Sequence, residues 1–140
     1  ALDVCETAQG QYPYSTEILI NKAHVLAAKG DFQHAFDAIH QAEIFQPSDP
    51  EVQQVKGEIY STQGYFDEAI RCYELAMPLS DEKDSLHFSI GMCYKLMGKI
   101  DLAIAHYFES IKITPYFEDS IHELGDSLYI KDEEPSEVLQ

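Results

Sequence analysis

The sequence has few cations. Nine lysines and arginines stand against 25 aspartates and glutamates in 140 residues, which gives a formal net charge of −16. Because such a chain repels phosphate groups and anionic lipid, nucleic acids and membrane surfaces are poor candidate partners. Long apolar runs are also missing: none approaches the ~20 residues that span a bilayer, and no charged-then-apolar leader opens the sequence. We therefore expect a cytoplasmic protein.

Cysteine is scarce as well. Cys5, Cys72 and Cys93 form an odd set without Cys-x-x-Cys spacing, so they resemble neither a disulfide framework nor a zinc site. The single asparagine, Asn21, does not lie in an N-glycosylation sequon. We expect the three thiols to be small buried side chains in a reducing compartment.

Sequence motifs of catalysis are absent. The chain has no glycine-rich phosphate loop, no nucleophile elbow and no Cys–His spacing typical of a metal site. The segment from His122 to Asp126 resembles the helical zinc motif His-Glu-x-x-His only in part, because Asp126 stands where the second histidine belongs. We therefore predict that the chain is not an enzyme, with no catalytic residues, no metal and no cofactor.

What the sequence does contain is a repeat with a period of 34 residues. The segments 29–35, 63–69 and 97–103 align at this constant offset without gaps. Counted from Thr16, Pro50 and Asp84, each unit has residues of the same kind at fixed positions. They are Ala23, Gly57 and Gly91 at position 8; Leu26, Tyr60 and Tyr94 at position 11; Gly30, Gly64 and Gly98 at position 15; Ala35, Ala69 and Ala103 at position 20; Ile39, Tyr73 and Tyr107 at position 24; and Pro47, Asp81 and Pro115 at position 32.

Each of these positions has a physical reason. Small residues at positions 8 and 20 allow two helices to approach closely, and the larger residues at positions 11 and 24 fill the space around that contact. Glycine at position 15 ends the first helix because it adopts a left-handed conformation without strain. Proline at position 32 ends the second helix because it cannot donate the helical hydrogen bond. The period therefore predicts antiparallel helix pairs, with seven helices over residues 16–130.

These markers resemble those of the tetratricopeptide repeat family. The resemblance implies an all-α fold, a right-handed α-solenoid of helix–turn–helix units. We predict three full repeats at 16–49, 50–83 and 84–117. They are flanked by the second helix of a partial repeat at 1–15 and by a partial repeat and tail at 118–140. Positions 4 and 7, which are usually apolar in the family, depart from the pattern with Gln53, His87, Lys22 and Lys56.

In this family the first helices of successive units line a concave groove, and the resemblance implies that peptide ligands bind there. Its lining would include Glu17, Ile20, His24, Glu51, Gln54, Glu58, Phe88, Met92, Lys95, Asp119, His122 and Asp126. Carboxylates dominate this set, beside an apolar patch at Phe88 and Met92, so we expect a protein or peptide ligand that combines basic residues with large apolar anchors. The positions at which chaperone-binding members hold an acidic C-terminal peptide carry no lysine, arginine or asparagine here.

The leading hypothesis is therefore a protein–protein interaction scaffold that is part of a longer repeat protein. Because solenoid ends normally carry a polar cap and none is evident at the start of this chain, we also expect self-association through uncapped ends. Two alternatives remain open. One is a stand-alone acidic chaperone resembling those of bacterial secretion systems, and the other is a regulatory domain of a larger enzyme or sensor.

Overall fold

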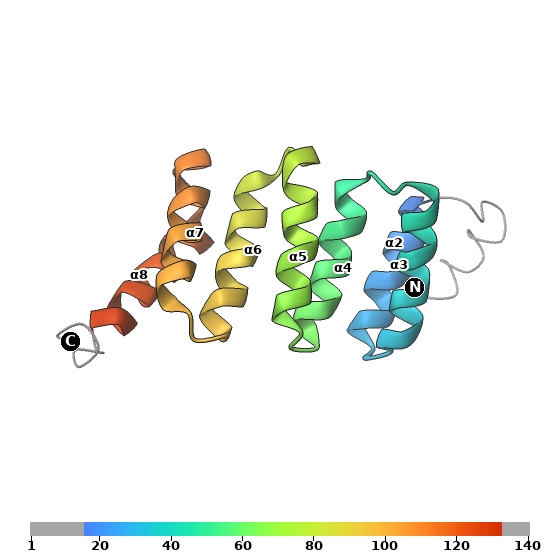
Figure 1. Cartoon of the computed structure of the whole chain (residues 1–140), viewed down its shortest axis with the longest axis horizontal. Coiled ribbons are helices and arrows are strands. Elements are labelled where there is room, and N and C mark those ends of the chain that lie inside the picture. Colours follow the sequence, from blue (N-terminus) through green and yellow to red (C-terminus); the bar gives the residue numbers. More distant parts are fainter. Residues whose placement is uncertain (1–15, 133–140) are drawn as a thin grey trace. The chain divides into compact units, whose positions relative to one another are not determined.

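The computed structural model describes residues 16–132, and this range contains seven α-helices and no strand (Figure 1). The helices are α2 (Thr16–Ala28), α3 (Phe32–Phe45), α4 (Pro50–Thr62), α5 (Phe66–Ala76), α6 (Lys83–Leu96), α7 (Ile100–Ile113) and α8 (Glu118–Asp132), with a 3₁₀ turn at Met77–Leu79. The all-α prediction and the expected seven helices are confirmed. The second helices expected over 1–15 and from Glu134 onward lie outside the described residues.

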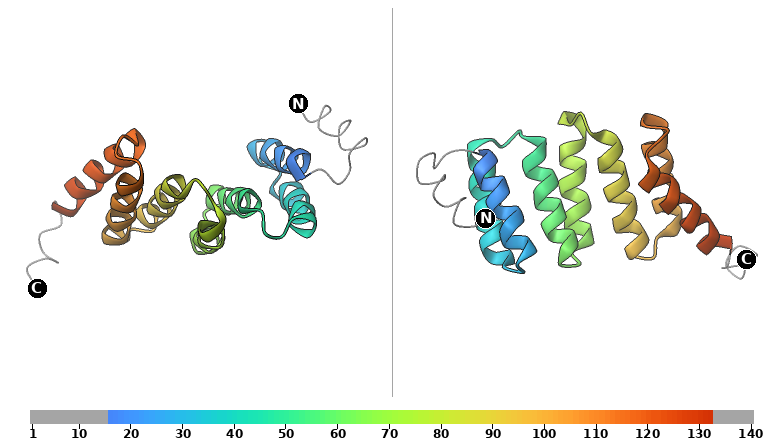
Figure 2. Two further views of the ribbon diagram at one scale, coloured as in Figure 1. Left: turned by 90° about the horizontal axis from the view of Figure 1, so that it is seen from above. Right: turned by 180° about the vertical axis from the view of Figure 1, so that it is seen from behind.

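The helices belong to two compact units, one ending at Ser80 and the other beginning at Asp81. In the first unit α2 pairs with α3, α4 pairs with α5, and α4 also contacts both helices of the preceding pair. In the second unit α6 pairs with α7, and α8 packs on α7 and also touches α6 (Figure 2). Each unit therefore brings two first helices, α2 with α4 or α6 with α8, next to each other.

Glycine ends the first helix of each full repeat as the sequence predicts. Gly30, Gly64 and Gly98 have φ angles of 83°, 88° and 82°, in the left-handed region that favours glycine. The residue after each glycine donates its backbone N–H to a carbonyl five residues earlier, for example Asp31 to Leu26 at 2.9 Å. This bond satisfies a carbonyl that the end of the helix leaves without a partner.

Small buried residues allow the two helices of each pair to pack closely, and in the second and third repeats a tyrosine ring covers a glycine. Ala35, Ala69 and Ala103 are fully buried, and the rings of Tyr73 and Tyr107 lie over the glycines at position 8. A Cβ atom added to Gly57 would lie 2.8 Å from the Tyr73 ring, and one added to Gly91 would lie 2.6 Å from the Tyr107 ring. Glycine is therefore what allows each tyrosine to cover the first helix.

Proline sets the lengths of the second helices. Helices α3 and α7 each have 14 residues and end two residues before Pro47 and Pro115. In the second repeat Asp81 replaces that proline, and α5 has only 11 residues because Pro78 converts its end into a 3₁₀ turn. The repeat register did not predict this early end.

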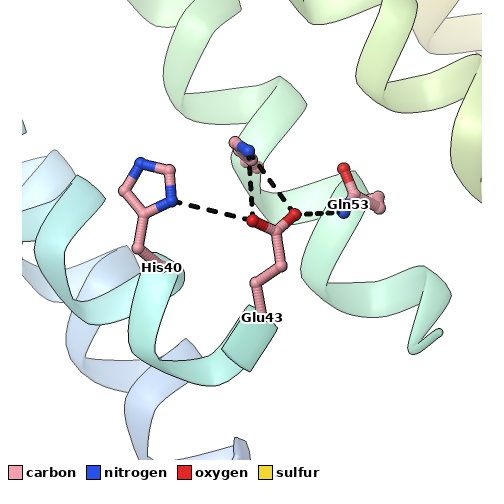
Figure 3. A network of polar contacts seen from close by, with 4 residues as sticks. His40, Glu43 and Gln53 are labelled. Atoms are coloured by element: carbon pink, nitrogen blue, oxygen red, sulfur yellow. Dashed lines mark hydrogen bonds and ion pairs between the residues drawn. The ribbon is translucent and has the colours of Figure 1, made fainter. Parts of the chain in front are cut away.

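Polar residues at positions 4 and 7 of the second repeat are explained by one carboxylate. Glu43 of α3 accepts hydrogen bonds from buried Gln53 and from the half-buried Lys56 on α4, and it lies 3.7 Å from His40 (Figure 3). The pKa of Glu43 is lowered because these partners outweigh the effect of its burial. A polar network thus accounts for the two polar residues of α4 and adds to the apolar packing of α4 on α2 and α3.

In the third repeat, the polar residue at position 4 is His87, which pairs with a second histidine. His87 of α6 and His106 of α7 place their Nδ1 atoms 3.1 Å apart, and the Tyr94 ring stacks on His106 at 5.5 Å. Cys72 and Cys93 are buried and form no disulfide within residues 16–132, whereas Cys5 lies outside the described residues. Among residues 16–132, no helix combines the length and apolar character that a bilayer span requires.

Candidate functional site

Exposed polar side chains of α2 and α4 form one surface on the first unit, here called the α2/α4 surface. It contains Glu17, His24, Glu51, Gln54 and Glu58, of which Glu17, His24 and Glu51 are exposed and Gln54 and Glu58 are half-buried. His24 Nδ1 on α2 lies 4.0 Å from Glu58 Oε2 on α4, so polar side chains of the two first helices come close together on this side. These are five of the six residues that the sequence predicts for the first two repeats.

The sixth residue is not on this surface. Ile20 is only 3% exposed and lies in the apolar core that α2 shares with α3 and α4, among Leu19, Val52 and Val55. Its removal from water contributes to packing, and its side chain is not accessible to a ligand. Ile20 is therefore removed from the set of candidate binding residues.

The carboxyl of Glu58 interacts with most of the other polar groups of the α2/α4 surface. Burial raises its pKa, and the nearby charge of Glu51 adds to this effect, while His24 and a hydrogen bond with Gln54 oppose it. A carboxylate whose ionised form is disfavoured in this way gains more from a cationic partner than a fully solvated one does. The surface is thus suited to accept a basic group.

On the second unit, α6 and α8 form a corresponding surface, here called the α6/α8 surface. Its apolar part is built on aromatic rings: Phe88 lies 6.1 Å from Tyr107 and 5.5 Å from Phe117, and the Tyr107 hydroxyl donates to Met92 Sδ at 3.3 Å. Phe88 and Met92 are half-buried by these contacts, so part of each side chain remains accessible. Leu96, one turn further along α6, is 61% exposed.

The polar part of the α6/α8 surface is organised by Lys95. Its ammonium group on α6 binds two carboxylates of α8, hydrogen-bonding to Glu123 and, at 2.7 Å, to Asp126. Partial burial works against the charge of Lys95, but these bonds outweigh it and hold the pKa of the lysine above its ordinary range. The same contact lowers the pKa of Asp126.

The remaining predicted residues, Asp119 and His122, are exposed on α8. The expected lining omitted Glu123 and Phe117, which the structure brings to this surface, and the fully buried Tyr107, whose ring supports Phe88 from within the core. The only sequence signal for Glu123 was its place in the partial zinc motif, where it and Asp126 in fact bind a lysine. The expected lining was drawn from the first helices only. It could not include Tyr107 and Phe117, because they come from α7 and the turn that follows it.

A family model, a curated protein and solved structures are similar to this chain. A model described as "Tetratricopeptide repeat" matches residues 50–81 and 84–117. The general transcriptional corepressor ssn6 of Schizosaccharomyces pombe is 28% identical over 120 residues, which are 84% of this chain and 11% of that protein. The chain thus spans a small part of the length of that curated relative.

Two solved structures show the same fold. TTC0263, described as a thermophilic TPR protein of Thermus thermophilus, has a TM-score of 0.84 at 21% identity, covering 92% of this chain and 72% of that one. The first TPR of Spaghetti (RPAP3), bound to the HSP90 peptide SRMEEVD, has a TM-score of 0.75 at 17% identity, covering 84% of this chain and 93% of that one. At this level of identity the likeness concerns the fold alone, a tetratricopeptide solenoid.

Proposed function

Because this chain belongs to the tetratricopeptide repeat family, whose fold serves as a protein–protein interaction scaffold, we propose that it binds a segment of a partner protein through its first helices. The α2/α4 surface takes basic side chains, whereas the α6/α8 surface by itself takes a large apolar side chain on Phe88 and a basic one near Glu123 and Asp126. The favoured ligand therefore combines lysine or arginine with one or two aromatic or aliphatic anchors.

One observation carries this proposal: an aromatic platform lies beside acidic groups on the same helix pair. Phe88 is held by the rings of Tyr107 and Phe117, so little side-chain entropy is lost when a ligand packs on it. Partly desolvated aromatic side chains supply much of the affinity at protein interfaces, whereas surrounding charges act mainly on association rate and specificity.

Lys95 occupies the acidic part of the α6/α8 surface in the absence of a ligand. Its ammonium group already occupies the position between Glu123 and Asp126 that a ligand cation would favour. We infer that a basic side chain of the ligand competes with Lys95 for these carboxylates. Asp119, one turn before Glu123, and His122 extend the same edge of α8 and would contact residues flanking that basic side chain.

The RPAP3 domain is bound to a peptide with two glutamates and an aspartate. A ligand of that charge is disfavoured here, because the α2/α4 surface carries Glu17, Glu51 and Glu58 and its one basic group is His24. We thus propose a basic ligand for this chain, in contrast to the acidic peptide that the RPAP3 domain binds.

The test begins with a phage-displayed peptide library selected on the immobilised chain, which should enrich sequences with basic residues and a large apolar residue. The enriched peptide is then synthesised and titrated by calorimetry. Phe88→Ala should weaken its binding at least tenfold at every salt concentration, since the apolar anchor is lost. Asp126→Lys, on the same helix pair as Phe88, should weaken it mostly at low salt, where screening over ~10 Å is incomplete.

Matched controls remove an aromatic ring or reverse a charge away from both surfaces. Phe108→Ala removes a partly exposed aromatic ring from α7, and Glu74→Lys reverses an exposed charge on α5. Neither should change the affinity for the peptide by more than about twofold. Enrichment of acidic peptides, or equal effects of Phe88→Ala and Phe108→Ala, would show that the ligand binds elsewhere.

A further inference from the structure

Four aromatic side chains of the first unit form a continuous row, here called the aromatic row. His40 and Phe36 come from α3, Tyr60 from α4 and Tyr65 from the turn between α4 and α5. Ring centroids lie 6.2 Å apart for His40 and Phe36 and 4.7 Å apart for Phe36 and Tyr60. The Tyr65 ring follows at 6.4 Å from Tyr60 and meets it edge to face. Both ends of the row are open to solvent, since Tyr65 is 54% exposed and the His40 side chain is 51% exposed.

Helix packing explains the middle of the aromatic row but not Tyr65. Phe36 and Tyr60 are half-buried where α3 meets α4. Tyr65 occupies the N-cap position of α5 without a cap hydrogen bond, whereas Asp31, at the same repeat position, accepts a backbone N–H of α3. The third repeat has the hydrophilic Lys99 at this position. A large exposed ring at this turn adds little to folding, which favours a role in binding.

The aromatic row does not overlap the surfaces assigned to the proposed function. Tyr60 and Glu58 are two residues apart on α4, so their side chains project about 200° apart around the helix axis. Phe88 and Lys95 belong to the second unit, whereas the whole row belongs to the first. A ligand on the row therefore uses a different part of the molecule.

A row of rings with free hydroxyl groups suits a ligand in the polyproline II conformation. Such a segment makes no internal hydrogen bonds, so its carbonyl groups are free to accept, and its prolines dock on aromatic side chains. The hydroxyls of Tyr60 and Tyr65 donate to no group among residues 16–132, so both are available to these carbonyls. Two residues of polyproline II advance about 6.2 Å, close to the 6.2 and 6.4 Å spacings of the row. An α-helical ligand offers no such carbonyls, because its own turns use them.

Charges beside the aromatic row favour a basic group next to the prolines. Asp37 and Asp67 are exposed and lie within two residues of members of the row. The cations of helices α3 to α5 are Lys56 and Arg71, and each is bound to a carboxylate, at 3.4 and 3.2 Å. An arginine or lysine of the ligand would therefore meet acidic groups that no cation of these helices occupies, which speeds association.

We propose that the aromatic row binds a proline-rich segment of a partner protein in the polyproline II conformation, with an arginine or lysine at one end. Prolines pack on Phe36, Tyr60 and Tyr65, and the two tyrosine hydroxyls donate to carbonyl groups of the segment. The basic side chain lies near Asp37 or Asp67. Neighbouring rings hold one another in place, so little side-chain entropy is lost on binding.

The test uses a fluorescein-labelled peptide of two arginines followed by nine prolines. Fluorescence anisotropy with the 140-residue chain should show saturable binding. A control peptide with glycine and serine in place of the prolines keeps the charge but is flexible, so it should bind at least tenfold more weakly. Replacing both arginines of the proline peptide by glutamate should weaken its binding more at low salt than at high salt.

Tyr65→Ala is the decisive change in the protein, because the ring is exposed and lies outside the helices. It should weaken binding of the proline peptide at least tenfold with little change in the melting temperature. Tyr65→Phe removes only the hydroxyl and should weaken binding about threefold. The matched control Tyr116→Ala removes an 88% exposed tyrosine from the second unit and should leave binding unchanged. Asp37→Lys should weaken it mainly at low salt.

Four results would overturn the proposal. Absence of saturable binding is the first, and equal binding of the proline and glycine–serine peptides is the second, since charge alone would then attract the probe. Equal effects of Tyr65→Ala and Tyr116→Ala would show that the peptide binds elsewhere. A dimer in sedimentation equilibrium that Tyr65→Ala dissociates would assign the row to a second copy of the chain. Phe88→Ala should leave the affinity for the proline peptide unchanged, which separates this inference from the proposed function.

Discussion

Glycine at repeat position 8 controls how closely two helices of a repeat approach. The Tyr107 ring lies where a side chain at Gly91 would begin, while the equivalent place at Gly125 is open. Glycine is therefore required at position 91 but not at position 125. The requirement comes from the packed ring, because helix propensity alone favours alanine over glycine by ~1 kcal/mol at both positions.

Alanine substitution separates these two effects. Gly91→Ala should lower the free energy of unfolding by about 1–3 kcal/mol, since a Cβ 2.6 Å from Tyr107 forces the ring to move. Gly125→Ala should raise it by up to ~1 kcal/mol. Urea denaturation followed by far-ultraviolet circular dichroism measures both. If Gly91→Ala is as stabilising as Gly125→Ala, the close packing of Tyr107 on α6 is not present in solution.

Adjacent repeats in the first unit are joined by a polar network as well as by apolar packing. Glu43 on α3 binds Gln53 and Lys56 on α4, and the Lys56 side chain is only 16% exposed (Figure 3). Removing the carboxylate would leave a half-buried ammonium group and a buried amide without their partner. Such losses cost more than the net contribution of the bonds themselves.

We therefore predict that Glu43→Ala lowers the free energy of unfolding by about 1–3 kcal/mol. Glu74→Ala, which removes an exposed carboxylate from α5, should change it by less than ~0.5 kcal/mol. Combining Glu43→Ala with Lys56→Met should cost less than the sum of the two single changes, since the unpaired ammonium group is then absent. Equal costs for Glu43→Ala and Glu74→Ala would contradict this account of the α3–α4 contact.

At the scale of the whole molecule, stability depends on how all titrating groups differ between the folded and unfolded chain. Burial lowers the pKa of His87 and His106 below their ordinary value of 6.5, the neighbouring His87 lowers that of His106 further, and Glu109 opposes both effects. The unfolded chain therefore binds protons at a higher pH than the folded chain does. The stability from these neutral imidazoles is fully present above pH 6.5 and is lost as the pH falls below it.

The free energy of unfolding should accordingly decrease between about pH 7.5 and about pH 5.5. Glu58, whose pKa is raised, acts in the opposite direction but nearer its ordinary value of 4.5, so it does not dominate this range. Urea denaturation at several pH values gives the slope, and His106→Gln should make it shallower. An unchanged slope in this variant would exclude the histidine pair as its cause.

The amino-acid sequence by itself determined the repeat and the local structure. The glycines at repeat position 15, the alanines at position 20 and the prolines at position 32 (Pro47 and Pro115) act within one turn or one helix pair, so a period of 34 residues was enough to predict them. For the same reason the all-α fold and the seven helices followed from the pattern, whereas the polar residues of the α2/α4 surface were expected from the family resemblance.

Only the tertiary structure decided which side chains remain available for binding. The helical position of Ile20 matches that of surface residues in other repeats, but the packing of α2 on α3 and α4 buries it. Lys95 and Glu123 are 28 residues apart, and their contact depends on the distance between α6 and α8. The aromatic row likewise depends on the packing of α3 against α4, which brings Phe36 and Tyr60 together. Such features depend on contacts between distant segments, which a local pattern does not contain.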